Sequence, residues 1–204
     1  MKTPESTTVE TRERIIKTAQ TLFHQKGICS VGVAEICQTA EIVKGSLYHF
    51  FPSKSELSKA VLERNWEILK GHIDFLKGKK VNGREKLELF FEGIIEGAIQ
   101  MQDEFGRILG CNIGSVVVEL AGLENSAKTY SARVLNLWLQ EFVGFIKEGQ
   151  ADKSIEPSLD PRATAEALLA LVQGMSVLGR AFNDIKALKR VARQGMSLVP
   201  KPFL

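Results

Sequence analysis

Helical periodicity is the feature that most constrains what this chain can fold into. Over residues 11–26, the apolar residues follow the i, i+4, i+7, i+8 spacing of one buried helix face. Similar patterns recur over residues 33–40, 44–50, 53–78, 87–101, 115–121, 125–150, 161–182 and 184–197. No segment alternates with period two over a useful length, so the sequence predicts an all-α fold.

Local signals mark where several of these helices begin and end. Gly27 follows the last turn of the first helix as a stop signal. The run Ser53-Lys54-Ser55-Glu56 is a capping box, and Asn82-Gly83 is a turn signal. Asp160 followed by Pro161 predicts an N-cap with proline at the first helical position.

Length and composition favour a soluble intracellular protein. The 204 residues suffice for one sizeable core, or for a small module plus a larger one. No apolar run reaches the roughly 18 residues that span a bilayer, and residues 1–10 are polar, without a secretory apolar core. Three widely spaced cysteines argue against a disulfide framework or a zinc cluster, so we expect a cytoplasmic, metal-free protein without a membrane anchor.

The segment 33–51 has the layout of a helix-turn-helix: a short helix, a four-residue turn and a second short helix. Successive helical residues rotate by about 100°. This rotation places Val43 with Leu47, Phe50 and Phe51 on one side. The opposite side carries Lys44, Gly45, Tyr48 and His49.

The polar side of this second helix suits contact with DNA. Its side chains can reach phosphates and base edges, and Gly45 lets the backbone approach closely. Lys54, at the start of the next helix, can meet a phosphate. No acid lies within residues 42–55, so the formal net charge of only +3 is not evidence against DNA binding. The alternative is that this side is an ordinary solvated face.

A longer pattern extends this interpretation. It reads Gly27-x8-Ile36-x3-Ala40-x3-Lys44-Gly45-Ser46-Leu47-Tyr48-His49-Phe50-Phe51-Pro52-Ser53-Lys54-Ser55-Glu56-Leu57. The pattern closely resembles the N-terminal signature of the tetracycline-repressor (TetR) family of bacterial transcription regulators, over about residues 10–60.

The resemblance implies an all-helical homodimer that binds a palindromic operator in double-stranded DNA. A three-helix helix-turn-helix domain would occupy residues 1–52, and a larger helical ligand-binding and dimerisation domain residues 53–204. It assigns DNA contacts to Lys44, Gly45, Ser46, Tyr48, His49 and Lys54. The long helices 125–150 and 160–182 would pair across the two-fold axis, which fits the small residues Ala163, Ala167, Ala170 and Gly174.

Three departures from the family pattern stand in the DNA-binding segment. Val31 and Gly32 replace the hydroxyl residues common before the second helix, and Gly32 supplies no side-chain cap. Glu41 stands where the turn often has glycine, which puts a negative charge near DNA. Val43 replaces Ser or Thr before the third helix. We expect altered operator preference rather than lost binding.

The segment Gly110-Cys111-Asn112-Ile113-Gly114 resembles a Gly-Cys element of one branch of the family, some of whose members sense electrophiles or oxidants through a thiol. Glycine-flanked Cys111 could be reached by a small electrophile, and a cation such as Arg180 would raise its reactivity by lowering its pKa. The alternative is that Cys111 is a small apolar packing residue. Cys37 is expected to be structural, and nothing near Cys29 argues that it is activated.

A reversible inducer would instead need an apolar, aromatic pocket with a few polar groups. Candidate lining residues are Trp66, Trp138, Phe142 and Met175, together with Phe90, Met101 and Tyr130, although residues at this helical spacing more often belong to the core. The scattered histidines support no metal cluster, and the sequence indicates no cofactor.

The sequence therefore predicts a DNA-binding transcriptional regulator, most often a repressor in this family, released by a small ligand or by thiol modification. A helical small-molecule-binding protein that has lost operator recognition is the alternative. No nucleophile–base pair, phosphate loop or carboxylate pair stands out, so we do not expect an enzyme.

Overall fold

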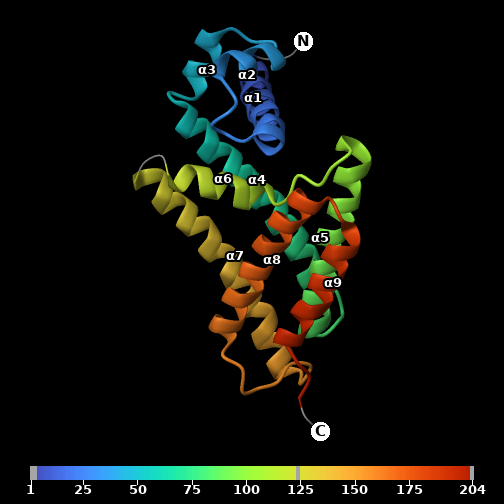
Figure 1. The fold of residues 1–204 in the computed structure, drawn as a ribbon. Helices are drawn as coiled ribbons and strands as arrows, with labels where there is room; N and C mark the ends of the chain where they lie inside the picture. Colours follow the sequence, from blue (N-terminus) through green and yellow to red (C-terminus); the bar gives the residue numbers. More distant parts are fainter. Residues whose placement is uncertain (1–3, 123–124, 203–204) are drawn as a thin grey trace. The chain divides into compact units, whose positions relative to one another are not determined.

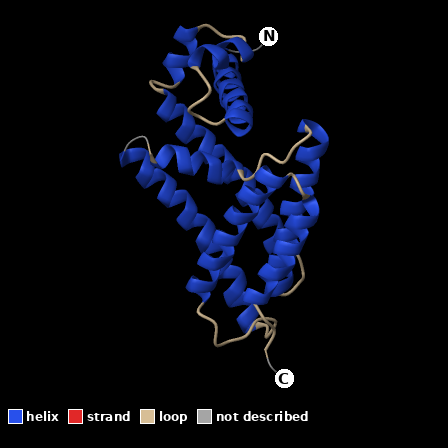
Figure 2. Ribbon diagram, viewed as in Figure 1, coloured by secondary structure: helices blue, strands red, loops and turns tan. Residues whose placement is uncertain are grey.

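The computed structural model describes residues 4–122 and 125–202, and these ranges contain helices and connecting loops but no strand (Figure 2). The predicted all-α fold class is confirmed. The helices are α1 (Pro4–Lys26), α2 (Val33–Thr39), α3 (Lys44–Phe50), α4 (Lys54–Lys77), α5 (Gly83–Phe105), α6 (Asn112–Ala121), α7 (Asn125–Ala151), α8 (Pro161–Phe182), α9 (Ile185–Gly195) and the 3-10 turn η1 (Met196–Leu198).

The chain divides into two compact units. The first contains the residues up to Glu67 together with Asn112–Val134, and the second contains Ile68–Cys111 together with the chain from Leu135 onward. This division describes packing. The division of function after residue 52 remains a prediction.

The first unit is built around α1, with α2 and α3 beside it (Figure 1). The predicted apolar face of α1 is buried, and Ile36 of α2, Leu47 of α3 and Leu57 of α4 are fully inaccessible. Helices of seven residues are not stable alone in water, so α2 and α3 depend on this shared core. Gly27 ends α1 with φ +86°, as the stop signal predicted.

In the second unit, α5 and α7 approach closely at Gly83. A Cβ added there would lie 2.2 Å from the backbone nitrogen of Gly149. The Asn82-Gly83 pair therefore begins α5 rather than forming a free turn. The Asn82 side chain accepts from the Glu85 N–H, and the Glu85 carboxylate accepts from the Asn82 N–H.

Aromatic side chains fill the core of the second unit. The ring centroid of Phe90 on α5 lies 5.0 Å from that of Phe142 and 6.1 Å from that of Trp138, both on α7. All three are buried. Helix α8 follows with the predicted cap, because the Asp160 side chain accepts from two backbone N–H groups and Pro161 takes the first position.

Several helix boundaries differ from the predicted ones. Helix α1 begins at Pro4 rather than near Thr11, since proline is favoured at a helix start and the polar residues after it are compatible with a helix. Helix α6 begins at Asn112 rather than Ser115. Gly114 suggested a loop, but Ile113 and Val116 are buried on either side of it and hold this segment in the helix.

Candidate nucleic-acid interface

A tight backbone motif joins α2 to α3. The Ile42 N–H donates to the Cys37 carbonyl at 3.0 Å, and the Glu41 N–H donates to the Gln38 carbonyl at 3.2 Å. This is the Schellman pattern, which needs a left-handed residue after the helix and usually uses glycine there. Here Glu41 takes that place with φ +52°. The helix-turn-helix geometry is thus achieved with a strained, charged residue in its turn.

Helix α3 presents most of the predicted DNA contacts on one exposed face. Lys44, Gly45, Tyr48 and His49 are exposed, whereas Leu47 is fully buried and anchors the opposite side. A Cβ at Gly45 would meet nothing within 4 Å, so the backbone there is open to close approach. The face combines a cation, bare backbone, a phenol and an imidazole, which can contact phosphates and base edges.

The remaining predicted contacts are less exposed. Ser46 is half-buried on the edge of α3, and half-buried Lys54 is the first residue of α4. The Ser53 half of the predicted capping box is seen beside it, since the Ser53 hydroxyl accepts from the Glu56 N–H at 3.1 Å. Lys54 therefore stands at a helix start, where free N–H groups favour an anion.

Val43 corrects the sequence-based assignment of faces. Its side chain was expected to pack with Leu47, but it is 72% exposed. The reason is that Val43 is the N-cap, with extended φ −83° and ψ 152°, so it lies outside the helical rotation. Beside Lys44, an exposed valine offers an apolar contact of the kind that recognises the methyl group of thymine. The rotation of about 100° per residue applies only within a helix, so it could not have revealed that the Val43 side chain is exposed.

Aromatic contacts fix the end of α3. The Arg12 guanidinium on α1 lies over the Phe51 ring, 5.4 Å from its centroid. Phe51 is buried, and the ring of His49 meets that of Phe50 edge-on at 5.0 Å. The Arg12–Phe51 contact holds the α3–α4 corner against α1, which limits how the exposed face of α3 can tilt.

The three cysteines occupy different environments. Cys37 is buried in α2, as expected for a structural residue, whereas Cys29 is exposed. A hydrogen bond to the Glu119 carboxylate, followed by the charge of that group, raises the pKa of the Cys29 thiol. Little thiolate forms near neutral pH under such conditions, so Cys29 is a poor nucleophile.

The Gly110-Cys111 segment packs against α8 within the second unit. The Cys111 N–H donates to the Ser176 hydroxyl at 2.6 Å, and the Gln173 amide nitrogen lies 4.0 Å from the Cys111 sulfur. Gly110 has φ +82°, and a Cβ there would lie 2.5 Å from the Ser176 hydroxyl. Cys111 is partly exposed, and Arg180 is exposed one turn beyond Ser176 on α8.

The predicted pocket residues lie mostly in the cores. Trp66 is buried in the first unit, and Trp138, Phe142 and Met175 are buried in the second. The indole N–H of Trp138 has no hydrogen-bond partner within the described part of the chain. A buried donor left in this state costs stability, and it could be satisfied by a ligand acceptor.

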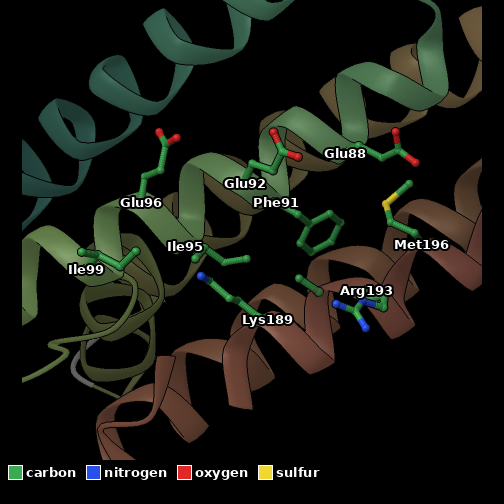
Figure 3. A pocket seen from close by; sticks show the side chains of 10 residues that line it. Glu88, Phe91, Glu92, Ile95, Glu96, Ile99, Lys189, Arg193 and Met196 are labelled. Carbon is green, nitrogen blue, oxygen red and sulfur yellow. The ribbon is translucent and has the colours of Figure 1, made fainter. Parts of the chain in front are cut away.

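A groove of about 440 Å³ lies elsewhere in the second unit, between α5 and α9 (Figure 3). Glu88, Glu92 and Glu96 lie along α5, and Lys189 and Arg193 face them from α9 across apolar side chains that include Phe91 and Ile95. None of the predicted pocket residues lines it. Two basic residues of α9, Lys189 and Arg193, therefore lie across the groove from glutamates of α5.

Helix α8 is apolar on two sides. Met175 and its neighbours are buried, while small residues and Val177 form a second, exposed stripe: Ala163, Ala167, Ala170, Gly174, Val177 and Ala181. By length and composition alone this helix could cross a membrane, and 33% of the window that meets this test is buried inside the protein. Small exposed residues at helical spacing allow a second helix to approach closely.

Comparison with known proteins places both parts of the chain in one family. The family described as "Bacterial regulatory proteins, tetR family" matches residues 15–61, and "Tetracyclin repressor-like, C-terminal domain" matches residues 83–195. The HTH-type transcriptional repressor DhaR of Mycobacterium sp. (strain GP1) is 31% identical over 164 residues, 80% of this chain and 79% of DhaR. The HTH-type transcriptional repressor NemR of Escherichia coli (strain K12) is 24% identical over 197 residues, 95% of this chain and 96% of NemR.

Solved structures show the same fold. The reduced form of E. coli NemR superposes with a TM-score of 0.81 at 23% identity, covering 95% of this chain and 100% of that one. The regulatory protein TetR from Rhodobacter sphaeroides gives 0.83 at 24% identity, covering 92% and 97%. With the C-terminal family match spanning more than half of the sequence and an exposed α3 face in a helix-turn-helix, the chain belongs to the tetR family and is a DNA-binding transcriptional regulator.

Proposed function

We propose that this regulator represses transcription by binding a palindromic operator as a homodimer, and that a small ligand or electrophile acting on its second unit releases it. The observation that supports DNA binding is the exposed face of α3, where Lys44, Tyr48 and His49 surround the open backbone of Gly45. No acid lies within α3 or at its N-cap.

The dimer is proposed to form through the exposed stripe of α8 together with α7, since the family resemblance implies that these two long helices pair across the two-fold axis. Leaving Val177 and Phe182 each 66% exposed in water is unfavourable, and pairing α8 with a second copy would cover them. A dimer presents two α3 faces, which matches the symmetry of a palindrome.

Two substitutions separate the roles proposed for the DNA contacts. Tyr48→Ala is expected to weaken binding to the operator more than binding to random duplex, because it removes a contact to base edges. Lys54→Ala is expected to weaken binding to all duplexes and to reduce the slope of log affinity against log salt by about 1, since one phosphate contact is lost. An unchanged salt slope in Lys54→Ala would show that Lys54 makes no phosphate contact in the complex.

The inducing signal is proposed to act at Cys111 or in the aromatic core. Partial exposure of Cys111 supports attack by an electrophile, with Arg180 as the candidate activating cation. For a reversible ligand, Trp138, Phe142 and Met175 would supply apolar contact within the second unit. The test is release of DNA by N-ethylmaleimide from the native chain and from Cys111→Ser, and equal release from both would exclude Cys111.

A second candidate function is a helical binding protein of this fold without operator recognition. The charged, strained Glu41 and the absence of side-chain caps at Gly32 and Val43 favour it. A gel-shift titration with the DNA upstream of the protein's own gene distinguishes the two, because the second candidate gives no band beyond that of random duplex.

We further propose that the protein is cytoplasmic and that regulation, not catalysis, is its activity. Its relatives are regulators by their descriptions. Among the described residues, no group of three or more His, Cys, Asp or Glu side chains is arranged to hold a metal ion.

A further inference from the structure

A carboxylate on α6 holds the loop that leads into the helix-turn-helix. The two oxygens of Glu119 accept from consecutive backbone N–H groups, that of Ile28 at 2.9 Å and that of Cys29 at 2.7 Å. All three residues belong to the first unit. Hydrogen bonds to an ionised acceptor are about twice as strong as neutral ones, so this is a firm attachment between segments 90 residues apart in sequence.

The loop is shaped to receive this carboxylate. A Cβ at Gly27 would lie 3.0 Å from one Glu119 oxygen, and the φ of +86° already requires glycine there. The side chains of Ile28 and Val31, in the same loop, are buried. The Lys26 ammonium meets the Glu35 carboxylate of α2 at 2.6 Å, which ties the end of α1 to the start of the helix-turn-helix.

The other end of α6 is tied to α4. The side-chain amide of Asn112, the first residue of α6, donates to the side-chain oxygen Oδ1 of Asn65 at 3.2 Å. The side-chain amide nitrogen of Asn65 in turn donates to the Asn112 backbone oxygen at 3.3 Å. Asn65 is 2% exposed, and its side-chain oxygen also accepts from Gln20 of α1 at 2.6 Å. Helix α6 lies beside α1 (Figure 1). It is therefore held at both ends, by Asn112 at its start and by the Glu119 carboxylate near its end.

From this geometry we infer that Glu119 is a positioning residue for DNA recognition: through the Ile28 and Cys29 N–H groups it sets the orientation in which α2 and α3 meet the operator. Glu119 itself touches no base in this account. Losing it frees the loop while Leu47 and Phe51 keep the core of the first unit intact. Specific binding, which needs two α3 faces in register, then falls more than non-specific binding, which needs only charge.

The test compares Glu119→Gln and Glu119→Ala with the native chain and with Val118→Ala. Val118 lies on the same helix, is 75% exposed and serves as the matched control. Glutamine keeps the size of the side chain but turns an NH₂ group toward one of the two N–H groups. Affinity is measured for an operator selected from a randomised duplex library by the native chain, and for a random duplex, at several salt concentrations.

We expect about tenfold weaker operator binding for both Glu119 variants, with an unchanged affinity and salt slope on random duplex. Hydrogen exchange at Ile28 and Cys29 accelerates in these variants, while Val118→Ala behaves as the native chain. If Glu119→Ala does not fold, the inference is tested on the isosteric Glu119→Gln alone.

Three outcomes would overturn the inference. Unchanged exchange would show that the attachment is absent in solution. Faster exchange with unchanged operator affinity would show that it does not position the helix-turn-helix. Equal loss on both duplexes would indicate general destabilisation. The inference rests on operator binding by the native chain, and failure of the native chain to select any sequence would instead refute the proposed function.

Discussion

Replacing Glu41 by glycine tests how the turn of the helix-turn-helix is held. A residue other than glycine in the left-handed region costs roughly 1–2 kcal/mol, and Glu41 has φ +52°. Glycine relieves this strain but loses roughly 0.5–1 kcal/mol more through the greater freedom of its unfolded chain. The net expectation for Glu41→Gly is a gain of about 0.75 kcal/mol in the free energy of unfolding, and of no more than about 1.5 kcal/mol.

Glu41→Ala is the matched control, because it removes the carboxylate but keeps the Cβ that causes the strain. Both variants and the native chain are unfolded in urea at the same protein concentration and followed by circular dichroism. Only the glycine variant is expected to be more stable. Both variants are expected to bind random duplex more tightly by a similar factor, since each removes a negative charge near DNA. A glycine variant no more stable than the alanine variant would refute the strain argument.

Two further predictions concern the packing of Gly83 and the exposed side chain of Val43, and a third concerns Asp152. Gly83→Ala should destabilise the protein by about 1–3 kcal/mol in urea unfolding, because the added Cβ would lie 2.2 Å from the Gly149 backbone nitrogen. Gly144→Ala is the control and should not destabilise the protein, because a Cβ there would meet no atom within 4 Å. Equal stabilities would contradict the packing of α5 on α7. Val43→Ala should weaken binding to the selected operator but not to random duplex, and a loss on both would exclude an apolar base contact.

The third of these concerns acid stability. Burial acts to raise the pKa of the Asp152 carboxyl, but hydrogen bonds from the Ser154 side chain and from the Gly83 and Ser154 N–H groups outweigh it and leave the pKa below its ordinary value. Its contribution to stability is therefore present above the unfolded pKa of about 3.8 and is lost as the pH falls through the lower folded value. Asp152→Asn should flatten the stability profile in that acid range, and an unchanged profile would rule the contribution out.

Much of the fold could be predicted because it rests on local periodicity. The buried face of α1, the cap at Asp160 and the stop at Gly27 all depend on residues within one or two helical turns of one another. The exposed side of α3 could be predicted for the same reason. The exception is Val43, which precedes the first helical turn and so does not follow the rotation of the helix.

The parts that could not be predicted depend on contacts between distant segments. Gly83 was interpreted as a turn residue because its partner, Gly149, is remote in sequence. The Glu119 carboxylate and the N–H groups of Ile28 and Cys29 form no local pattern, and α6 itself was expected to begin later. Likewise the groove between α5 and α9 is lined by charges of opposite sign from two helices, and no sequence spacing reveals that these helices lie together.

The central claim is that two copies of the α3 face read a palindrome. Selection of duplexes from a randomised library by the native chain tests it most directly. The account predicts enrichment of a palindrome whose half-site centres lie about one DNA turn apart, roughly 34–36 Å, or a multiple of it. Enrichment of no sequence, or of a single half-site without symmetry, would contradict it.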